Sequence, residues 1–357
     1  MTTNVIIPAA GQSTRFCTSK PKWMLTHPDG SLMINKSIQN LDLNDVDKVY
    51  VTVLQEHLDK FNFEEPLKQS FSDIGVECNL VKLDEPTVSQ PETVYQTIEK
   101  EKIEGSIFIK DCDSSFSHKV SSGDYVTVCD ANTVPDIRQL GAKSFVSYDE
   151  NLVLSNIVEK NIVSPFFCTG GYGFSDARSF SKSFLLSRHT SKTEQSLYIS
   201  DVIYYMMLVE NKNFRASHVS DYYDWGTIEE WNRYKRKYAT LFVDIDGVIF
   251  KNSGKYSVPR WTGNRLENNI SCLKKLSDTG KVTIIFTTSR DLSHQKQTEK
   301  ALESTGIKYD RVIYGLPHAQ RIVINDYADT NPYRSCSSIN IKRDEDELTK
   351  LLNYYVN

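Results

Sequence analysis

The stretch Leu241–Phe250 (LFVDIDGVIF) decides how the rest of the chain is divided. Its first residues are mostly apolar and predict a buried strand, which ends in Asp244 and Asp246 and turns at Gly247. Burial of two carboxylates is unfavourable unless a cation or hydrogen-bond donors meet them. In an open α/β sheet, ligands bind at the carboxyl ends of the strands. An acidic surface turn, with Asp246 and Gly247 as its turn pair, is the alternative interpretation.

The LFVDIDG pattern resembles the opening motif of the haloacid dehalogenase (HAD) phosphatase superfamily. In that superfamily the first aspartate is the nucleophile and the second is the general acid/base, which implies these roles for Asp244 and Asp246. Thr288 follows a second expected strand, and the resemblance assigns it to the phosphoryl group. A further expected strand opens at Arg321 and ends at Asp326, which the resemblance assigns as a Mg²⁺ ligand together with the first two aspartates.

One HAD feature is missing, because Leu316 stands where the superfamily normally supplies a lysine. Three aspartates and a phosphate dianion need more positive charge than one Mg²⁺ provides, and we expect Arg321 to supply it. Arg321 opens the expected strand, so it lies several residues of roughly 3.3 Å from the end that carries Asp326. His318 is the alternative cation, and an impaired site is the third interpretation. The intervals between the motifs are too short for a cap domain, so the resemblance is to capless members such as capsule-biosynthesis phosphatases.

The N-terminal segment carries a second diagnostic pattern. A short apolar run at residues 4–8 predicts a strand, and AAGQSTRF (residues 9–16) and KPK (residues 20–22) follow it. Small residues after a strand let backbone N–H groups approach an anion, and the arginine adds further donors. The combination resembles the signature of the nucleotidyltransferase superfamily that joins a nucleoside triphosphate to a phosphorylated sugar or alcohol. The resemblance implies that the triphosphate is bound by Ala10, Gly11, Ser13, Arg15 and Lys22.

Carboxylates follow another expected strand at residues 106–110. The nucleotidyltransferase resemblance places a Mg²⁺ ligand at this strand end, and Asp113 matches it best, with Asp111 in support. The late segment DYYDWGTIEE (residues 221–230) resembles the D-x-G-T-x-E-D segment of the same superfamily and gives Asp224 as the second ligand. Mg²⁺ takes few carboxylates and completes its shell with phosphate and water, which suits two aspartates.

The resemblance also implies substrate contacts between these motifs. Gln90 and Thr93 are candidate contacts to the base, although the same segment (SQPET, residues 89–93) also predicts a helix start with a serine N-cap. The two interpretations are compatible.

On the acceptor side, Glu159 and Lys160 resemble the pair that contacts hydroxyl and phosphate groups. Glu-Lys pairs are also common on ordinary surfaces. Gly171 belongs to a glycine-rich segment that resembles the wall of the acceptor pocket.

Composition restricts the class of protein. The 357 residues predict two domains, and 39% hydrophobic and 25% charged residues with a net charge of −4 exclude a disordered chain and a nucleic-acid binder. Seven dispersed cysteines without metal spacing predict reduced thiols in a cytoplasmic protein. We expect no signal peptide and no membrane span.

We therefore expect an α/β protein of two domains. Residues 1–236 should form a nucleotidyltransferase domain with a mixed, mostly parallel sheet, and residues 237–357 a smaller Rossmann-like HAD domain. The expected protein is bifunctional. It makes an NDP-activated sugar or polyol (CDP-activated, by resemblance) with release of pyrophosphate, and it hydrolyses a phosphomonoester with Mg²⁺, for surface or capsular polysaccharide synthesis. In the alternative, the HAD domain is catalytically weak and serves as a regulatory or scaffolding module.

Overall fold

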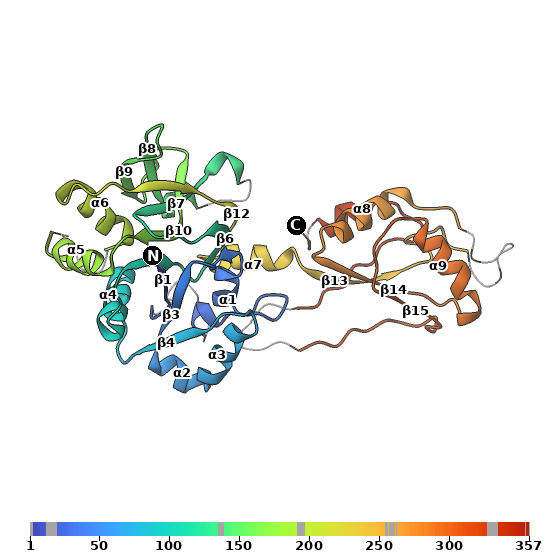
Figure 1. The fold of residues 1–357 in the computed structure, drawn as a ribbon. Coiled ribbons are helices and arrows are strands. Elements are labelled where there is room, and N and C mark those ends of the chain that lie inside the picture. The colour runs from blue at the N-terminus through green and yellow to red at the C-terminus, as the bar shows by residue number, and fades with distance from the viewer. Residues whose placement is uncertain are drawn as a thin grey trace. The chain divides into compact units, whose positions relative to one another are not determined.

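The computed structural model describes residues 3–11, 20–134, 139–190, 197–253, 256, 261, 263–326, 335–353 and 355–356. The chain divides into two compact units, Met1–Ile228 and Glu229–Asn357 (Figure 1). From the sequence we expected the domain boundary after residue 236, at the C-terminal end of helix α7 (Ile228–Arg236), which is eight residues later than the division after Ile228. Within the described residues, every helix is too short or too polar to cross a membrane.

The first unit is organised around a large mixed sheet. Its strands are β1 (Thr3–Pro8), β3 (Val46–Leu54), β4 (Cys78–Leu83), β5 (Ser106–Lys110), β7 (Tyr125–Asp130), β8 (Ser144–Tyr148), β9 (Leu154–Glu159), β10 (Phe166–Phe174) and β11 (Arg215–His218). The main order is β11-β7-β10-β5-β1-β3-β4, and the β8–β9 hairpin joins beside β10. Strands β1, β3, β4 and β5 are parallel, whereas β10 runs antiparallel to β5 and β7. The expected mixed, mostly parallel sheet is confirmed.

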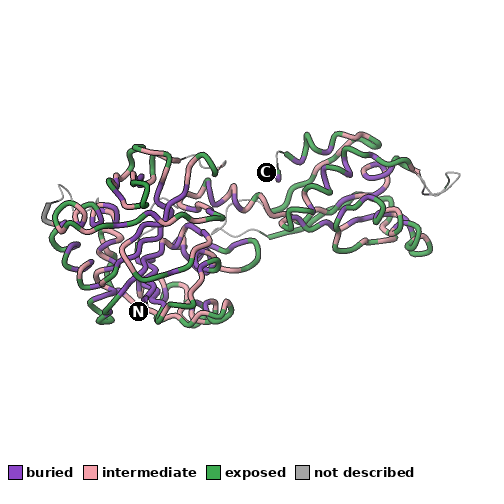
Figure 2. Tube along the Cα trace, turned by 45° about the horizontal axis from the view of Figure 1, so that its top comes forward, coloured by how far each residue is buried: buried purple, intermediate pink, exposed green. Residues whose placement is uncertain are grey.

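Helices cover both faces of this sheet, which explains why its central strand β1 is buried at every residue. Alternate residues of a strand point to opposite faces. Ile6 and Ile107 belong to one apolar cluster, with side chains of α4 (Gln90–Glu101), α5 (Ala177–Thr190) and α6 (Ile199–Val209). Val5, Ile7 and Phe108 belong to the other, with side chains of α1 (Met33–Ile38), α2 (Gln55–Phe61) and α3 (Glu64–Ser72). Figure 2 shows the buried trace running through the middle of the unit.

A smaller sheet and short 3-10 helices complete the first unit. The small sheet has the order β12-β6-β2 and consists of β2 (Leu41–Asp42), β6 (Ser114–Lys119) and β12 (Ser220–Asp224). The 3-10 helices are η1 (Lys22–Met24), η2 (Ala131–Thr133) and η3 (Leu140–Ala142). Because β5 ends one short turn before β6 begins, the small sheet continues directly from the carboxyl end of a central strand of the large one.

The second unit is a smaller α/β unit with a parallel sheet. Its strands β13 (Ala239–Asp244), β14 (Val282–Thr287) and β15 (Arg311–Ile313) lie in chain order. Its helices are α7, α8 (Glu267–Asp278), α9 (Gln295–Glu303) and α10 (Leu348–Leu352), with η5 (Leu292–His294) before α9. Helix α8 connects β13 to β14, and α9 connects β14 to β15. This alternation is the expected Rossmann-like pattern, and the strands predicted at residues 241 and 281 are confirmed.

The expected strand that opens at Arg321 is wrong. Residues 321–326 have no regular secondary structure, and Ile322 and Ile324 are 73% and 93% exposed. A strand exists only through hydrogen bonds to a neighbouring strand. In the described part of the second unit, the sheet order β13-β14-β15 includes no pairing with this segment. The apolar pattern of residues 322–324 predicted a strand, but the pattern by itself does not supply a partner edge.

A close packing contact in the large sheet leads to a prediction for stability. A Cβ atom at Gly173 would lie 2.2 Å from Cε1 of its cross-strand partner Tyr125, which is buried and packs on Phe108 with ring centroids 5.9 Å apart. We predict that Gly173→Ala lowers the free energy of unfolding by about 1–3 kcal/mol through overpacking. Urea unfolding measures this loss. Gly141→Ala, where a Cβ atom would meet open space, is the control, and equal midpoints for the two variants would contradict the prediction.

Candidate functional site

The carboxyl end of β5 carries the first part of the site. The backbone N–H of Asp111 donates to the carbonyl oxygen of Gly170 at 2.8 Å, and the Gln90 side-chain amide donates to Asp111 Oδ1 at 2.5 Å. Burial, together with the charge of Asp113, raises the pKa of Asp111 to about 6. The strand end therefore holds negative charge at a place where water solvates it poorly.

Lysine 110 holds the turn that contains these aspartates. Its side chain is fully buried, and its ammonium donates to the carbonyl oxygens of Asp111 and Ser114, each at 2.8 Å, and to Ser114 Oγ at 2.9 Å. Ser114 Oγ in turn donates to the carbonyl oxygen of Thr169 at 2.9 Å. Burial lowers the pKa of Lys110 to about 8, against the opposing influence of Asp111 and Asp113. The hydrogen bonds of the buried Lys110 ammonium thus hold the turn between β5 and β6 in one conformation.

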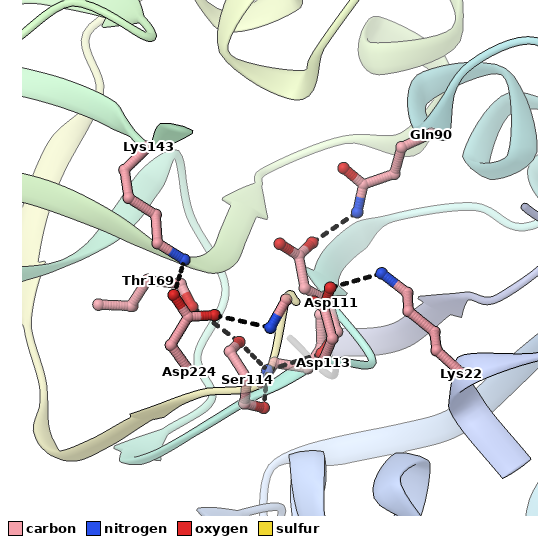
Figure 3. A network of polar contacts seen from close by, with 10 residues as sticks. Lys22, Gln90, Asp111, Asp113, Ser114, Lys143, Thr169 and Asp224 are labelled. Carbon is pink, nitrogen blue, oxygen red and sulfur yellow. Dashed lines mark hydrogen bonds and ion pairs between the residues drawn. The ribbon is translucent and has the colours of Figure 1, made fainter. Parts of the chain in front are cut away.

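The two aspartates expected to bind Mg²⁺ lie close together, Asp113 in the turn before β6 and Asp224 at the end of β12 (Figure 3). Asp224 is opposite Ser114 in the pairing of β12 with β6, and the N–H of Trp225 donates to the carbonyl oxygen of Asp113 at 2.8 Å. The ammonium of Lys22 lies 2.5 Å from Asp113 Oδ2. The structure brings Asp113 and Asp224 together although they are far apart in the sequence.

Asp224 is paired with Lys143, whose ammonium contacts its Oδ2 atom. The N–H of Gly226 donates to Asp224 Oδ1 at 3.0 Å. Burial alone would lower the pKa of Lys143, but Tyr222 and Asp224 raise it above the ordinary value for lysine. Lys143 therefore carries a positive charge next to the expected metal ligand.

The donor set suits a divalent cation. Within the described residues no group of three or more histidine, cysteine, aspartate and glutamate side chains is arranged to hold a metal. Two carboxylates that leave room for phosphate and water oxygens are nevertheless the usual protein share of a Mg²⁺ site. Burial and the charge of Asp113 disfavour the charged form of Asp111, and a divalent cation nearby would oppose that shift. Asp113 and Asp224 fit this role.

The expected triphosphate loop is described only in part. Ala10 is buried and packs with Leu54 and Leu83 beside the end of β1, whereas Gly11 is exposed with open space around its Cα. Ser13 and Arg15 lie outside the described residues.

The segment expected to contact the base begins helix α4. Ser89 caps the helix by accepting from the N–H of Glu92, as expected from the sequence. The Gln90 amide points to Asp111, as Figure 3 shows, and so lies at the site. Thr93 is buried, and its hydroxyl is hydrogen-bonded to the hydroxyl of Thr87 at 2.6 Å. Gln90 is therefore placed to contact a ligand, whereas the Thr93 hydroxyl has an internal partner.

The expected acceptor contacts lie at the end of β9. Glu159 Oε2 accepts hydrogen bonds from Ser144 Oγ and, at 2.7 Å, from Ser200 Oγ. Lys160 has a φ of +53°, and its ammonium is hydrogen-bonded to the hydroxyl of Tyr198. The glutamate is thus held in one orientation by two serines.

Two adjacent glycines of β10 have different surroundings. Gly170 has a φ of +90°, and a Cβ atom there would lie 2.6 Å from Asp111 Oδ2, so only glycine permits this approach. A Cβ atom at Gly171 would lie 2.6 Å from Thr127 Oγ1 and 2.8 Å from the ring of Phe108. Gly171, which we expected in the acceptor pocket, faces the packed interior, and Gly170 is the glycine that contacts the site.

The sequence analysis missed Lys110 and Lys143. Lys110 had a local signal, because it is the only charged residue of the apolar strand SIFIK. Lys143 had none, since it precedes an ordinary strand and meets Asp224 only through the fold.

In the second unit, the carboxylate of Asp246 is held by a buried arginine. Arg290 is 1% exposed, and its Nε and Nη2 atoms donate to the two Asp246 oxygens at 2.9 and 2.7 Å. Its Nη1 atom donates to Thr298 Oγ1 at 3.1 Å. Thr288 is buried beside this pair and accepts from the N–H of Arg290 at 3.1 Å. The sequence analysis gave Arg290 no function.

Asp244 lies at the end of β13, and Arg321 Nη2 is 3.7 Å from its Oδ1 atom. Burial raises the pKa of Asp244, while Arg321 opposes this shift. The expected separation of Arg321 from the site is wrong because residues 321–326 do not form a strand. Asp326 is exposed, and the described residues contain no metal cluster that joins it to Asp244 and Asp246. Within the described residues, the three aspartates that the HAD resemblance assigns to Mg²⁺ do not form one group of carboxylates.

Comparison with known proteins establishes one fold. No protein-family model and no curated protein matches the chain. Among solved structures, the nucleoside-diphosphate-sugar pyrophosphorylase from Vibrio cholerae has 18% identity and a TM-score of 0.52, over 65% of this chain and 99% of that chain. A candidate glucose-1-phosphate thymidylyltransferase from Bacillus anthracis has 16% identity and a TM-score of 0.51, over 66% and 94%. The large mixed sheet therefore has the nucleotidyltransferase fold.

The raised pKa of Asp111 gives a prediction for pH dependence. A pKa of about 6 in the folded protein, against the ordinary value of 3.8 for aspartate, means that the folded protein binds more protons than the unfolded protein between these pH values. The contribution of Asp111 to stability is therefore lost as the pH rises from 4 to 6. We predict that Asp111→Asn removes this loss. Between pH 4 and 7 the free energy of unfolding of the variant should therefore rise by about 1–3 kcal/mol relative to that of the wild-type protein. Urea unfolding in the presence of EDTA measures the free energy of unfolding at each pH, and Asp45→Asn, which changes an exposed aspartate, is the control. Parallel curves of unfolding free energy against pH for the wild type and Asp111→Asn would contradict the prediction.

Proposed function

We propose that the first unit is a nucleotidyltransferase that converts a nucleoside triphosphate and a phosphorylated acceptor into an NDP-activated product and pyrophosphate. The observation that carries this proposal is the adjacent pair Asp113 and Asp224, each ion-paired with a lysine, beside a central strand end of a nucleotidyltransferase-type sheet. Ligands of open α/β sheets bind at such strand ends.

The chemistry needs positioning and charge neutralisation, and no side-chain nucleophile. A phosphate oxygen of the acceptor forms a bond to the α-phosphorus, the bond from that phosphorus to the bridging oxygen of the β-phosphate breaks, and pyrophosphate leaves with that oxygen. Lys22, together with Arg15 by resemblance, donates to the triphosphate. Asp113 and Asp224 would hold Mg²⁺, which neutralises negative charge on the phosphate oxygens when bound.

The substrate side of the proposal rests on resemblance together with the positions of a few side chains. Gln90 lies at the site through its contact with Asp111 and is the proposed contact to the base. Glu159, oriented by two serines, and Lys160 are the proposed contacts to the acceptor. We propose CTP as the donor, a phosphorylated sugar or polyol as the acceptor, and a surface or capsular polysaccharide as the destination of the product.

The test is a matrix of four nucleoside triphosphates against phosphorylated sugars and polyols, with pyrophosphate release as the readout at saturating Mg²⁺. The proposal expects release that requires both a triphosphate and an acceptor. Absence of release with every pair would reject it, and release with a triphosphate other than CTP would reject only the choice of donor.

The proposed Mg²⁺ ligand Asp224 has a matched control within the same strand. We predict that Asp224→Asn lowers the rate of pyrophosphate release at least about 100-fold, because it removes a preorganised charge from the site. Asp221→Asn changes an exposed carboxylate that only accepts from serine hydroxyls, and its rate should equal that of the wild type. Near-normal release by Asp224→Asn at saturating Mg²⁺ would remove this residue from the site.

For the second unit we propose hydrolysis of a phosphomonoester, with Asp244 as the nucleophile, which would make the protein bifunctional. The contact of Asp244 with Arg321 favours this candidate, because an arginine beside the nucleophile provides the positive charge that the missing lysine would have supplied. The carboxylates expected to bind Mg²⁺ do not meet in this arrangement, so we derive no metal-assisted step. The competing proposal is a regulatory or scaffolding module, which the clamp of Arg290 on Asp246 favours.

The two activities should be separable. We predict that Asp244→Asn abolishes phosphate release from a phosphomonoester, that Arg321→Ala reduces it at least about tenfold, and that neither variant changes pyrophosphate release. Arg311→Ala, which removes a 70% exposed arginine side chain of the same unit, is the control. Loss of both activities in a folded Asp244→Asn protein would indicate one composite site. Absence of phosphatase activity in the wild-type protein would reject hydrolysis by the second unit and favour the regulatory or scaffolding proposal.

A further inference from the structure

Lys143 belongs to the first unit, and none of the sequence motifs assigns it a function. Its side chain is 19% exposed, and the Asp224 side chain with which it pairs is 10% exposed. Its ammonium also lies 5.9 Å from the ring centroid of Tyr222. A buried ion pair adds little to stability, because the loss of hydration offsets the attraction between the charges. Stability of the fold alone therefore does not account for a lysine at this position.

Lys143 directly precedes β8, the strand that pairs with β9, and the proposed acceptor contacts lie at the end of β9. The carbonyl oxygen of Lys143 accepts from the N–H of Lys160 at 3.0 Å, and the next residue, Ser144, donates from its side chain to Glu159. The ammonium meanwhile reaches Asp224, as Figure 3 shows. Lys143 thus connects the acceptor side of the site with the metal side.

Among the described residues of the site, three carboxylates are accompanied by three ammonium groups before any metal binds. The carboxylates and ammonium groups that meet there are those of Asp111, Asp113 and Asp224, and of Lys22, Lys110 and Lys143. A divalent cation on Asp224 would repel the ammonium of Lys143 at such short range. The ammonium then needs another anion, and the acceptor phosphate is the anion that must approach from its side of the site.

We propose that Lys143 is the acceptor-side cation of the nucleotidyl-transfer site. It neutralises Asp224 in the metal-free protein and, once Mg²⁺ occupies Asp224, donates to the phosphate whose oxygen attacks the α-phosphorus. The exchange keeps the attacking phosphate from repulsion by Asp224 and neutralises its charge. This inference rests on the proposed nucleotidyl transfer and adds a residue that contacts the substrate.

The first measurement uses metal alone and needs no turnover. In the full-length protein without substrates, Lys143→Met removes the cation that competes with the metal, so the Kd for Mn²⁺, measured by electron paramagnetic resonance, should fall about fivefold. Lys143→Gln keeps a hydrogen bond to Asp224 without the charge and should shift the Kd in the same direction, and it replaces the methionine variant if that variant does not fold. Lys119→Met, which removes an exposed lysine paired with Asp45, should leave the Kd unchanged. Unchanged or weaker Mn²⁺ binding by both Lys143 variants would overturn the inference, because a structural lysine would behave in that way.

The second measurement separates the acceptor from the nucleotide. Lys143→Met should raise the KM for the acceptor and lower kcat, with a combined loss in kcat/KM of at least about tenfold, while the Kd for the nucleoside triphosphate stays unchanged. Lys143→Arg keeps the charge and should recover most of this loss. Wild-type values of kcat and acceptor KM in Lys143→Met would overturn the contact with the acceptor.

The two proposals fail in different ways. A wild-type protein that releases no pyrophosphate from any substrate pair rejects nucleotidyl transfer, and with it the contact of Lys143 with an acceptor. The Mn²⁺ titration still decides whether Lys143 and the metal compete for Asp224. A wild-type protein that turns over, with Lys143 variants that match it in both measurements, rejects only the inference on Lys143.

Discussion

The first unit depends on one electrostatic constraint, which is how to keep several carboxylates at the end of a buried strand. Asp111 and Asp113 follow β5 directly, and β12 brings Asp224 beside them. Carboxylates in a poorly solvated place need nearby cations. The fold supplies them from separate segments, with Lys110 from the strand itself and Lys143 from the start of β8. Both lysines place positive charge beside these carboxylates, and Lys143 is the one that we propose contacts a phosphorylated acceptor.

Much of the first unit could be predicted from local patterns. The apolar run before residue 9 forms the buried strand β1, and the capping serine before Gln90 starts helix α4 where expected. Such features depend on neighbouring residues alone, so the sequence contains the information. The segment after Arg321 shows the limit. Its apolar residues have strand character, but a strand also requires a partner edge, and residues 321–326 have none in the described sheet.

The carboxylates of the candidate site could be named from sequence motifs. Their cationic partners could not, because those contacts form only in the folded chain. Asp113 and Asp224 were expected as a pair, and Asp113 directly precedes Ser114, the residue of β6 that pairs with Asp224 of β12. Lys143 reaches Asp224 from a separate part of the chain, and no local pattern distinguishes it from other lysines. A Cβ atom at Gly171 would meet packed side chains, whereas one at Gly170 would meet Asp111, because adjacent residues of a strand face opposite sides. The sequence does not say which glycine of such a pair approaches the site.

The second unit illustrates a conflict between two uses of one carboxylate. A general acid must exchange a proton with its substrate, whereas Asp246 has both oxygens engaged by the guanidinium of Arg290. Asp244 has a different environment, since it is only half-buried and its one described cationic contact, Arg321, is longer. Asp246 is thus held in one orientation by Arg290, whereas Asp244 is the more exposed of the two carboxylates, at 43% against 12%. In the proposed phosphatase, Asp246 would have to release Arg290 before it could exchange a proton with the leaving group.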